Sequence, residues 1–234
     1  MKARGLILGA LAAVALALPP AAGAAAPRVQ QLVVFRDGAA VQKTVGTWHA
    51  SVAVRGRRCT VGDGTALAAL VRSKAGSLRL RDFGACSTRP SDSAGLLVTG
   101  IGPDRNRGQQ GWVYKVGHRA ATAGAGDTGG PFGRGRLRWG QWVTWFYCVR
   151  AADCQRTLGL TASVFRGGVA AEVRGYDDAG DGIPIEGATV TASGVSGVTD
   201  AEGRVQLELH TGFQRLVARK DGLVRSFTKL VEVP

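Results

Sequence analysis

The chain has 234 residues and a formal net charge of +13 at pH 7, and beyond its N-terminal region it is long enough for one or two domains. No later stretch is long and apolar enough to cross a membrane, so we expect no span after that region. The basic balance favours acidic partners such as wall phosphopolymers, lipid headgroups or nucleic acid. A compositional origin explains it equally well, because 17 of the 20 basic residues in 28–165 are arginines, as GC-rich coding produces.

The first residues have the pattern of a secretory signal peptide. Lys2 and Arg4 precede an apolar run of 13 residues, 6–18, and small residues follow up to Ala24. The alternative, an uncleaved anchor, needs about 20 apolar residues. We therefore expect a signal peptide over 1–24 and a secreted protein, either released or held at the cell wall by non-covalent contacts. Export also disfavours a nucleic-acid partner.

Four cysteines in a secreted chain predict two disulfides. The sequence allows three pairings, of which we favour Cys59–Cys86 and Cys148–Cys154. The first pair closes a loop of 26 residues, which stabilises the fold by about 3 kcal/mol in the chain-entropy model. The alternative is a zinc site that uses cysteines with His49 or His118, but no C-x-x-C spacing is present.

Charge divides the rest of the chain into two parts. Residues 28–165 carry 20 basic residues, seven Asp and no Glu, together with all four Cys and all five Trp. Residues 166–234 carry 8 basic and 10 acidic residues. We therefore predict domains over 28–165 and 166–234, with Gly167–Gly168 as a short hinge.

The first part predicts strands around one helix. A strand over 51–55 precedes a helix over 66–75, capped by Thr65 and ended by Gly76. A glycine-rich loop covers 120–136, and 28–44 form an extra strand pair. The remaining predicted strands cover 78–83, 96–101, 112–116 and 141–149. One helix on a small mixed sheet is an α+β arrangement.

The second part predicts strands and turns only. Its turns are rich in Asp and Gly, which is typical of a β-sandwich. The predicted strands cover 169–175, 188–192, 205–209, 214–219 and 225–233.

The first part resembles the transcobalamin C-terminal-like domain family, over roughly 45–160. The segment GWVYKVG (111–117) is similar to its "GW-x-Y-x-V-N/G" strand, and LRWGQWV (137–143) to the entry of its closing strand, where Gln141 replaces the usual Asp. The resemblance implies a β-grasp fold with one helix. It does not imply cobalamin binding, because the vertebrate carriers add a large helical barrel that this chain lacks.

The second part looks like the carboxypeptidase-regulatory-like, or transthyretin-like, β-sandwich. The similar segments are GIPIEGATV (182–190), TDAEGRV (199–205) and GFQRLVA (212–218). The resemblance implies a structural or adhesive module without catalysis. Together the two resemblances predict an α+β β-grasp domain with one helix, followed by an all-β sandwich domain.

No pattern in the chain indicates an enzyme. The three histidines are scattered, and H-E-x-x-H, G-x-S-x-G, Walker A and EF-hand patterns do not occur. Asp177, Asp178 and Asp181 fit a hairpin turn better than a calcium site. The glycines of 124–130 precede Pro131 rather than a helix, so a phosphate cradle is weakly indicated. We expect no catalysis, no metal and no cofactor.

Aromatic side chains beside arginines suit stacking on sugars or other planar ligands, with the charge supporting anions. Both faces of the strand over 141–149 are apolar, so we expect exposed rings among Trp139, Trp142 and Phe146. Alternatively, 28–44 or the other domain covers the second face. The candidate binding residues are Trp112, Tyr114, Arg134, Arg136, Arg138, Trp139 and Trp142.

The function these patterns predict is that of a secreted, non-catalytic binding or adhesion protein. We expect a monomer that recognises an anionic cell-wall polymer or another extracellular ligand. A structural surface protein without a small-molecule ligand, and a cobalamin-like small-molecule scavenger, are the alternatives.

Overall fold

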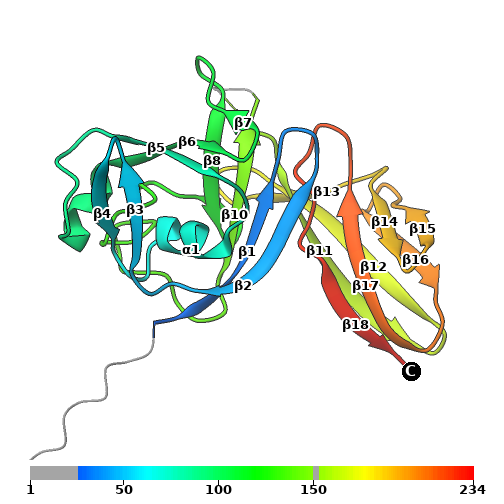
Figure 1. Cartoon of the computed structure of the whole chain (residues 1–234). Helices are drawn as coiled ribbons and strands as arrows, with labels where there is room; N and C mark the ends of the chain where they lie inside the picture. The colour runs from blue at the N-terminus through cyan, green and yellow to red at the C-terminus, as the bar shows by residue number, and fades with distance from the viewer. Residues whose placement is uncertain (1–25, 150–152) are drawn as a thin grey trace, which may run out of the picture.

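The computed structural model describes residues 26–149 and 153–234, and within them the protein is mostly β, with one α-helix, one 3₁₀ helix and several separate sheets. Figure 1 shows two units side by side, with the α-helix in the N-terminal unit. The predicted signal peptide lies outside the described residues.

A five-stranded mixed sheet organises the first unit. Its strand β1 runs parallel to β10, and every other neighbouring pair is antiparallel. The predicted strand pair over 28–44 therefore lies inside the main sheet rather than beside it. In order across the sheet, the strands are β2 (Ala40–Gly46), β1 (Arg28–Val34), β10 (Trp142–Cys148), β8 (Gly111–Val116) and β9 (Arg119–Ala120).

Helix α1 (Ala66–Ser73) begins where the sequence predicts. The Thr65 side-chain oxygen accepts a hydrogen bond from the Ala68 N–H at 3.1 Å, which satisfies one free donor of the first turn. The helix ends earlier than predicted, because Lys74, with φ of 49°, takes the left-handed conformation expected of Gly76. Its apolar side packs on β1, β2 and β3.

Two small sheets complete the first unit. Both predicted disulfides are present, and Cys59–Cys86 ties β4 to the segment before the 3₁₀ helix η1 (Pro90–Gly95). One sheet pairs β3 with β4, and the other pairs β5, β6 and β7. Their bounds are Ala50–Val54 (β3), Arg57–Val61 (β4), Leu78–Asp82 (β5), Leu96–Ile101 (β6) and Asp104–Arg105 (β7).

The second unit consists of two four-stranded antiparallel sheets that share one apolar core, with Val173, Val190 and Leu216 fully buried. The first sheet contains β11 (Thr157–Phe165), β12 (Gly168–Tyr176), β13 (Gly182–Pro184) and β16 (Arg204–Glu208). The second contains β15 (Val195–Val198), β14 (Thr189–Ala192), β17 (Gly212–Arg219) and β18 (Lys229–Val233).

The boundary between the units lies before Thr157 rather than at 165. Strand β11 pairs with β12 along its whole length, so Arg166–Gly167 is the turn of a hairpin inside the second unit. The predicted hinge is therefore part of a sheet. Charge placed the division too late, because net charge does not report which strands pair.

The second unit covers one face of the main sheet. Leu32, Phe146 and Val224 form a buried cluster there, and Phe227 packs against it. Phe146 is 1 % exposed, whereas Trp142 is 39 % and Trp139 69 % exposed. Most of this face is therefore covered by the second unit, as the alternative interpretation predicted. Trp142, at the margin of the covered area, remains partly exposed.

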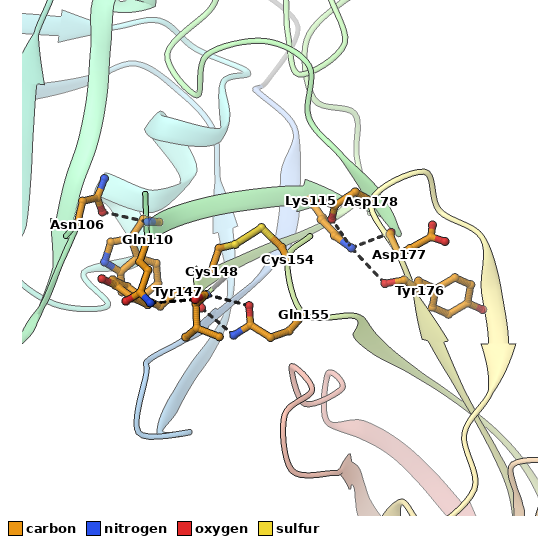
Figure 2. The surroundings of a disulfide bond; sticks show 12 residues. Asn106, Gln110, Lys115, Tyr147, Cys148, Cys154, Gln155, Tyr176, Asp177 and Asp178 are labelled. Atoms are coloured by element: carbon orange, nitrogen blue, oxygen red, sulfur yellow. Dashed lines mark hydrogen bonds and ion pairs between the residues drawn. A yellow bond between two sulfur atoms is a disulfide. The ribbon is translucent and has the colours of Figure 1, made fainter. Parts of the chain in front are cut away.

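A buried ammonium group joins the two units. Lys115 on β8 is 1 % exposed, and its Nζ donates hydrogen bonds to the Tyr176 carbonyl (3.1 Å) and the Asp177 carbonyl (2.7 Å), as Figure 2 shows. It also lies 3.0 Å from an Asp178 carboxylate oxygen. Burial lowers the pKa of Lys115, and the hydrogen bond and charge of Asp178 oppose this effect. All of these acceptors belong to the second unit, so they hold the cation only when the units are docked.

We predict that Lys115→Met lowers the free energy of unfolding by about 1–3 kcal/mol. In this variant the Tyr176 and Asp177 carbonyls are left without the donor that they have in the original chain. Urea unfolding followed by tryptophan fluorescence measures the change. Lys43→Met is the control, since Lys43 is exposed and donates one hydrogen bond, to the Ser73 carbonyl. We expect it to shift stability by less than about 0.5 kcal/mol. Equal effects of the two variants would contradict the role assigned to Lys115.

Candidate functional site

The structure separates the predicted binding residues into three recesses. Trp112 and Tyr114 are buried and line an apolar cleft in the first unit. Arg134, Arg136 and Arg138 surround a second hollow. Trp142 lines a pocket between the units, and Trp139 lies outside all three recesses.

The apolar cleft has a volume of about 430 Å³ and is lined by residues 112–115 of β8 together with Trp145 and Phe146 of β10. Strand β6 and the glycine-rich segment 120–125 form the opposite walls. Leu96, Val98 and Trp145 contribute buried apolar surface. Two exposed apolar side chains, Phe83 and Leu97, lie at its rim.

Hydrogen bonds fix both ends of the cleft. Asn106 bridges β6 and β8, because its Nδ2 donates to the Val98 carbonyl (3.1 Å) and its Oδ1 accepts from the Trp112 N–H (3.0 Å). The Tyr114 hydroxyl donates to the Ala123 carbonyl at 2.8 Å and so holds the glycine-rich segment against β8. Burial, with the nearby charge of Asp127, raises the pKa of Tyr114, so the phenol stays neutral.

One donor in the cleft wall has no partner. Trp145 is 1 % exposed and stacks on Tyr114, with ring centroids 5.0 Å apart. In the described part of the chain, nothing accepts a hydrogen bond from its buried indole N–H. Buried polar groups are nearly always paired, so this donor is an exception. Trp145 lines the cleft, but its nitrogen has almost no accessible surface. Sequence patterns do not predict this unpaired donor, because a Trp in a strand is typical of any core.

The part of the cleft nearest the second unit has a polar lining whose groups are already paired. Lys115, Asp178 and Cys154 line it, close to the Cys148–Cys154 disulfide (Figure 2). The side chain of Gln155 fixes the chain here, because it bonds the Tyr147 carbonyl at 3.0 Å and the Val149 N–H at 3.1 Å. The polar groups at this end are thus already bonded within the protein.

The arginine hollow has a volume of about 360 Å³ and includes Arg119, which the sequence did not single out. The Arg119 guanidinium lies 5.4 Å from the ring centre of Phe132. Of the four arginines around the hollow, only Arg136 has an ion-pair partner among the described residues, Asp63 at 2.6 Å. The hollow is therefore a concentration of uncompensated positive charge.

The carboxylates proposed for calcium are engaged inside the protein. Asp177 accepts from the Asp181 N–H at 2.8 Å and pairs with Arg156 at 3.2 Å, and Asp178 pairs with Lys115. The hydrogen bond from Asp181, aided by the charge of Arg156, lowers the pKa of Asp177. Across residues 26–149 and 153–234, no cluster of three or more His, Cys, Asp or Glu could hold a metal ion.

Comparison with known proteins found no family model, no curated protein and no solved structure that matches the chain. The two disulfides indicate an oxidising location, as outside the cell. Among the described residues, no helix is long and apolar enough to cross a membrane.

A histidine lies in the contact between the units. The His118 ring stacks on Tyr176 of the second unit, with centroids 3.5 Å apart, and meets Trp142 edge-on. Burial lowers the pKa of His118 below its ordinary value of 6.5, and the charge of Lys115 adds to this effect. The folded protein therefore takes up this proton less readily than the unfolded chain.

We predict that stability is highest above pH 6.5 and falls as the pH drops below that value towards the folded pKa, because only the unfolded chain gains the His118 proton there. One such proton contributes at most about 1.4 kcal/mol per pH unit. His118→Phe keeps the ring contact and should flatten the dependence, measured by urea unfolding at pH 7.5 and 5.5. His210→Phe, at an exposed position, should keep the dependence of the original chain. A dependence unchanged in His118→Phe would contradict the assignment.

Proposed function

We propose that this is a secreted, non-catalytic binding protein that holds a small, largely apolar molecule in the cleft beside β8. The observation that carries the proposal is the cleft itself, with about 430 Å³ and a lining made mainly of Trp, Tyr, Leu, Val and Ala side chains. Ligand pockets are commonly about 300–1,000 Å³, mostly apolar, with a few placed polar groups.

The state of the nearby polar groups supports binding rather than catalysis. The Lys115 ammonium is held by acceptors of the second unit, and the Tyr114 hydroxyl by the Ala123 carbonyl. A general acid or base must be within reach of its substrate and at a suitable pKa. The shifted pKa values of Lys115 and Tyr114 follow from burial.

The proposal includes the two domain types that the sequence resembles. A β-grasp assignment for the first unit is supported by the order β2-β1-β10-β8, by the parallel pairing of β1 with β10, and by the single helix packed on β1 and β2. A β-sandwich assignment for the second is supported by two sheets around one core. In this scheme the sandwich is a docking unit that covers the back of the ligand-binding sheet.

We predict that Leu97→Glu weakens binding of the neutral apolar fluorophore N-phenyl-1-naphthylamine at least tenfold. The side chain lies at the cleft rim and is 45 % exposed, so the charge disturbs the cleft more than the fold. Fluorescence titration gives the dissociation constant. Val198→Glu, at a 63 % exposed position on β15, is the matched control and should bind as the original chain does. Equal affinities in the two variants would mean that the fluorophore binds outside the cleft.

The arginine hollow supports a second candidate function, recognition of an anionic wall polymer. Arg134 and Arg138 are exposed and, among the described residues, form no ion pair. A polyanion bound at such a site is held mainly by charge, so its affinity falls with salt.

We predict that Arg134→Gln with Arg138→Gln lowers the salt dependence of binding to poly(glycerol phosphate). Each lost contact reduces the slope of log affinity against log salt by about one. Arg57→Gln with Arg58→Gln makes the same charge change at exposed positions on β4. Titration at several salt concentrations separates the two pairs. Equal slopes would mean that the basicity acts only through net charge.

A further inference from the structure

The third recess lies between the two units and has a volume of about 350 Å³. The first unit contributes Gln30, His118 and Trp142, and the second contributes strand β11 and the segment 225–230. Pockets for small molecules occur preferentially at domain interfaces. This recess is separate from the apolar cleft, and its lining has a different chemistry.

An exposed indole forms one wall of the pocket. Trp142 is 39 % exposed, although its ring packs on Phe227 of the second unit at 5.4 Å between centroids. The His118 ring meets it edge-on at 6.4 Å. The two neighbouring rings leave part of the indole open to the pocket, where the apolar face of a bound ring could stack.

Two cations of the second unit line the same pocket. Arg225 donates from Nε to the Ser226 carbonyl (3.1 Å) and from Nη2 to the Thr228 hydroxyl (2.8 Å). Within the described chain, neither Arg225 nor Lys229 forms an ion pair, and the pocket lining contains no carboxylate. Burial, and then the charge of Arg219, lower the pKa of Arg225.

A hydroxyl in the pocket wall lacks a partner. Thr157 is 5 % exposed, and its Oγ1 is buried without a hydrogen bond among the described residues. Its neighbours in the wall, Leu158 and Leu160, are apolar. Because Oγ1 has almost no accessible surface, a ligand hydroxyl can donate to it or accept from it only after the Thr157 side chain rotates toward the pocket.

We propose that this pocket binds an acidic sugar, a pyranose that carries a carboxylate. The sugar ring stacks on Trp142, the carboxylate pairs with Arg225 and Lys229, and a ring hydroxyl bonds Thr157. A simple inorganic anion would use the cations but neither the indole nor the hydroxyl, and a neutral sugar would leave the cations unpaired. Because both units supply the lining, the bound sugar also holds them together.

The test is a calorimetric titration of the full chain with methyl β-D-glucuronide. The matched probes are methyl β-D-glucoside, which lacks the charge, and inorganic phosphate, which lacks the ring. We expect saturable glucuronide binding, at least tenfold tighter than that of either matched probe. No saturable binding at millimolar concentration, or equal affinity for glucuronide and glucoside, would overturn the proposal. An affinity for phosphate equal to that for the glucuronide would show a general anion site and would also overturn the proposal.

Single substitutions test the role proposed for each residue that contacts the sugar. Arg225→Gln should weaken glucuronide binding at least tenfold and leave glucoside binding unchanged, and Thr157→Val, of nearly equal volume, should weaken both a few-fold. Trp142→Ala should weaken both at least tenfold. The controls are Arg204→Gln, an exposed arginine of β16, and Trp139→Ala, an exposed indole outside the pocket. If Trp142→Ala does not fold, the other two variants decide. Unchanged glucuronide affinity in both would overturn the proposal.

Discussion

The docked arrangement of the two units depends on the buried ammonium of Lys115. Removing such a charge from water is costly unless acceptors replace the water, and here every acceptor comes from residues 176–178. The cation can therefore be buried only when the second unit is in place. The same docking buries Phe146 against Val224, brings Asp178 to the end of the apolar cleft, and sets His118 on Tyr176. The docked second unit thus contributes one end of the cleft and part of the pocket between the units.

Local patterns were sufficient for much of the fold. The cap at Thr65, the strands that alternate in polarity and the presence of two disulfides were predictable, because each depends on residues near one another in the chain or on cysteine parity. The favoured pairing was one of three that the sequence allowed, and the structure has it. Strand β11 was not predicted as a strand, although Leu158, Leu160 and Val164 alternate with small or polar residues. The division drawn from charge placed this segment at the end of the first domain, away from its partner β12. Lys115 was equally hidden, because a lysine in a strand usually points to solvent, and only the second unit makes its burial possible.

The candidate binding residues show the same limit. Arg134, Arg136 and Arg138 alternate along the chain and surround one hollow, and Trp112 and Tyr114, two residues apart, share one wall of the cleft. Residues close in the sequence therefore share a recess. Spacing could not show that the three groups lie in different recesses. Nor could it show that the cations nearest Trp142 in its pocket come from the far end of the chain, because tertiary contacts alone bring Arg225 and Lys229 there.

The unpaired polar groups distinguish the recesses from the rest of the interior. Gln31 has an unsatisfied amide too, but it lines none of the three recesses, whereas Trp145 and Thr157, whose unpaired atoms are buried, each line one. A polar group in a closed core that lacks a partner only destabilises the fold, but in a recess it can be satisfied by whatever enters. The cleft offers a donor among apolar side chains, and the pocket offers a hydroxyl beside two cations. The two recesses therefore select opposite chemistries, and one molecule satisfying both is not expected.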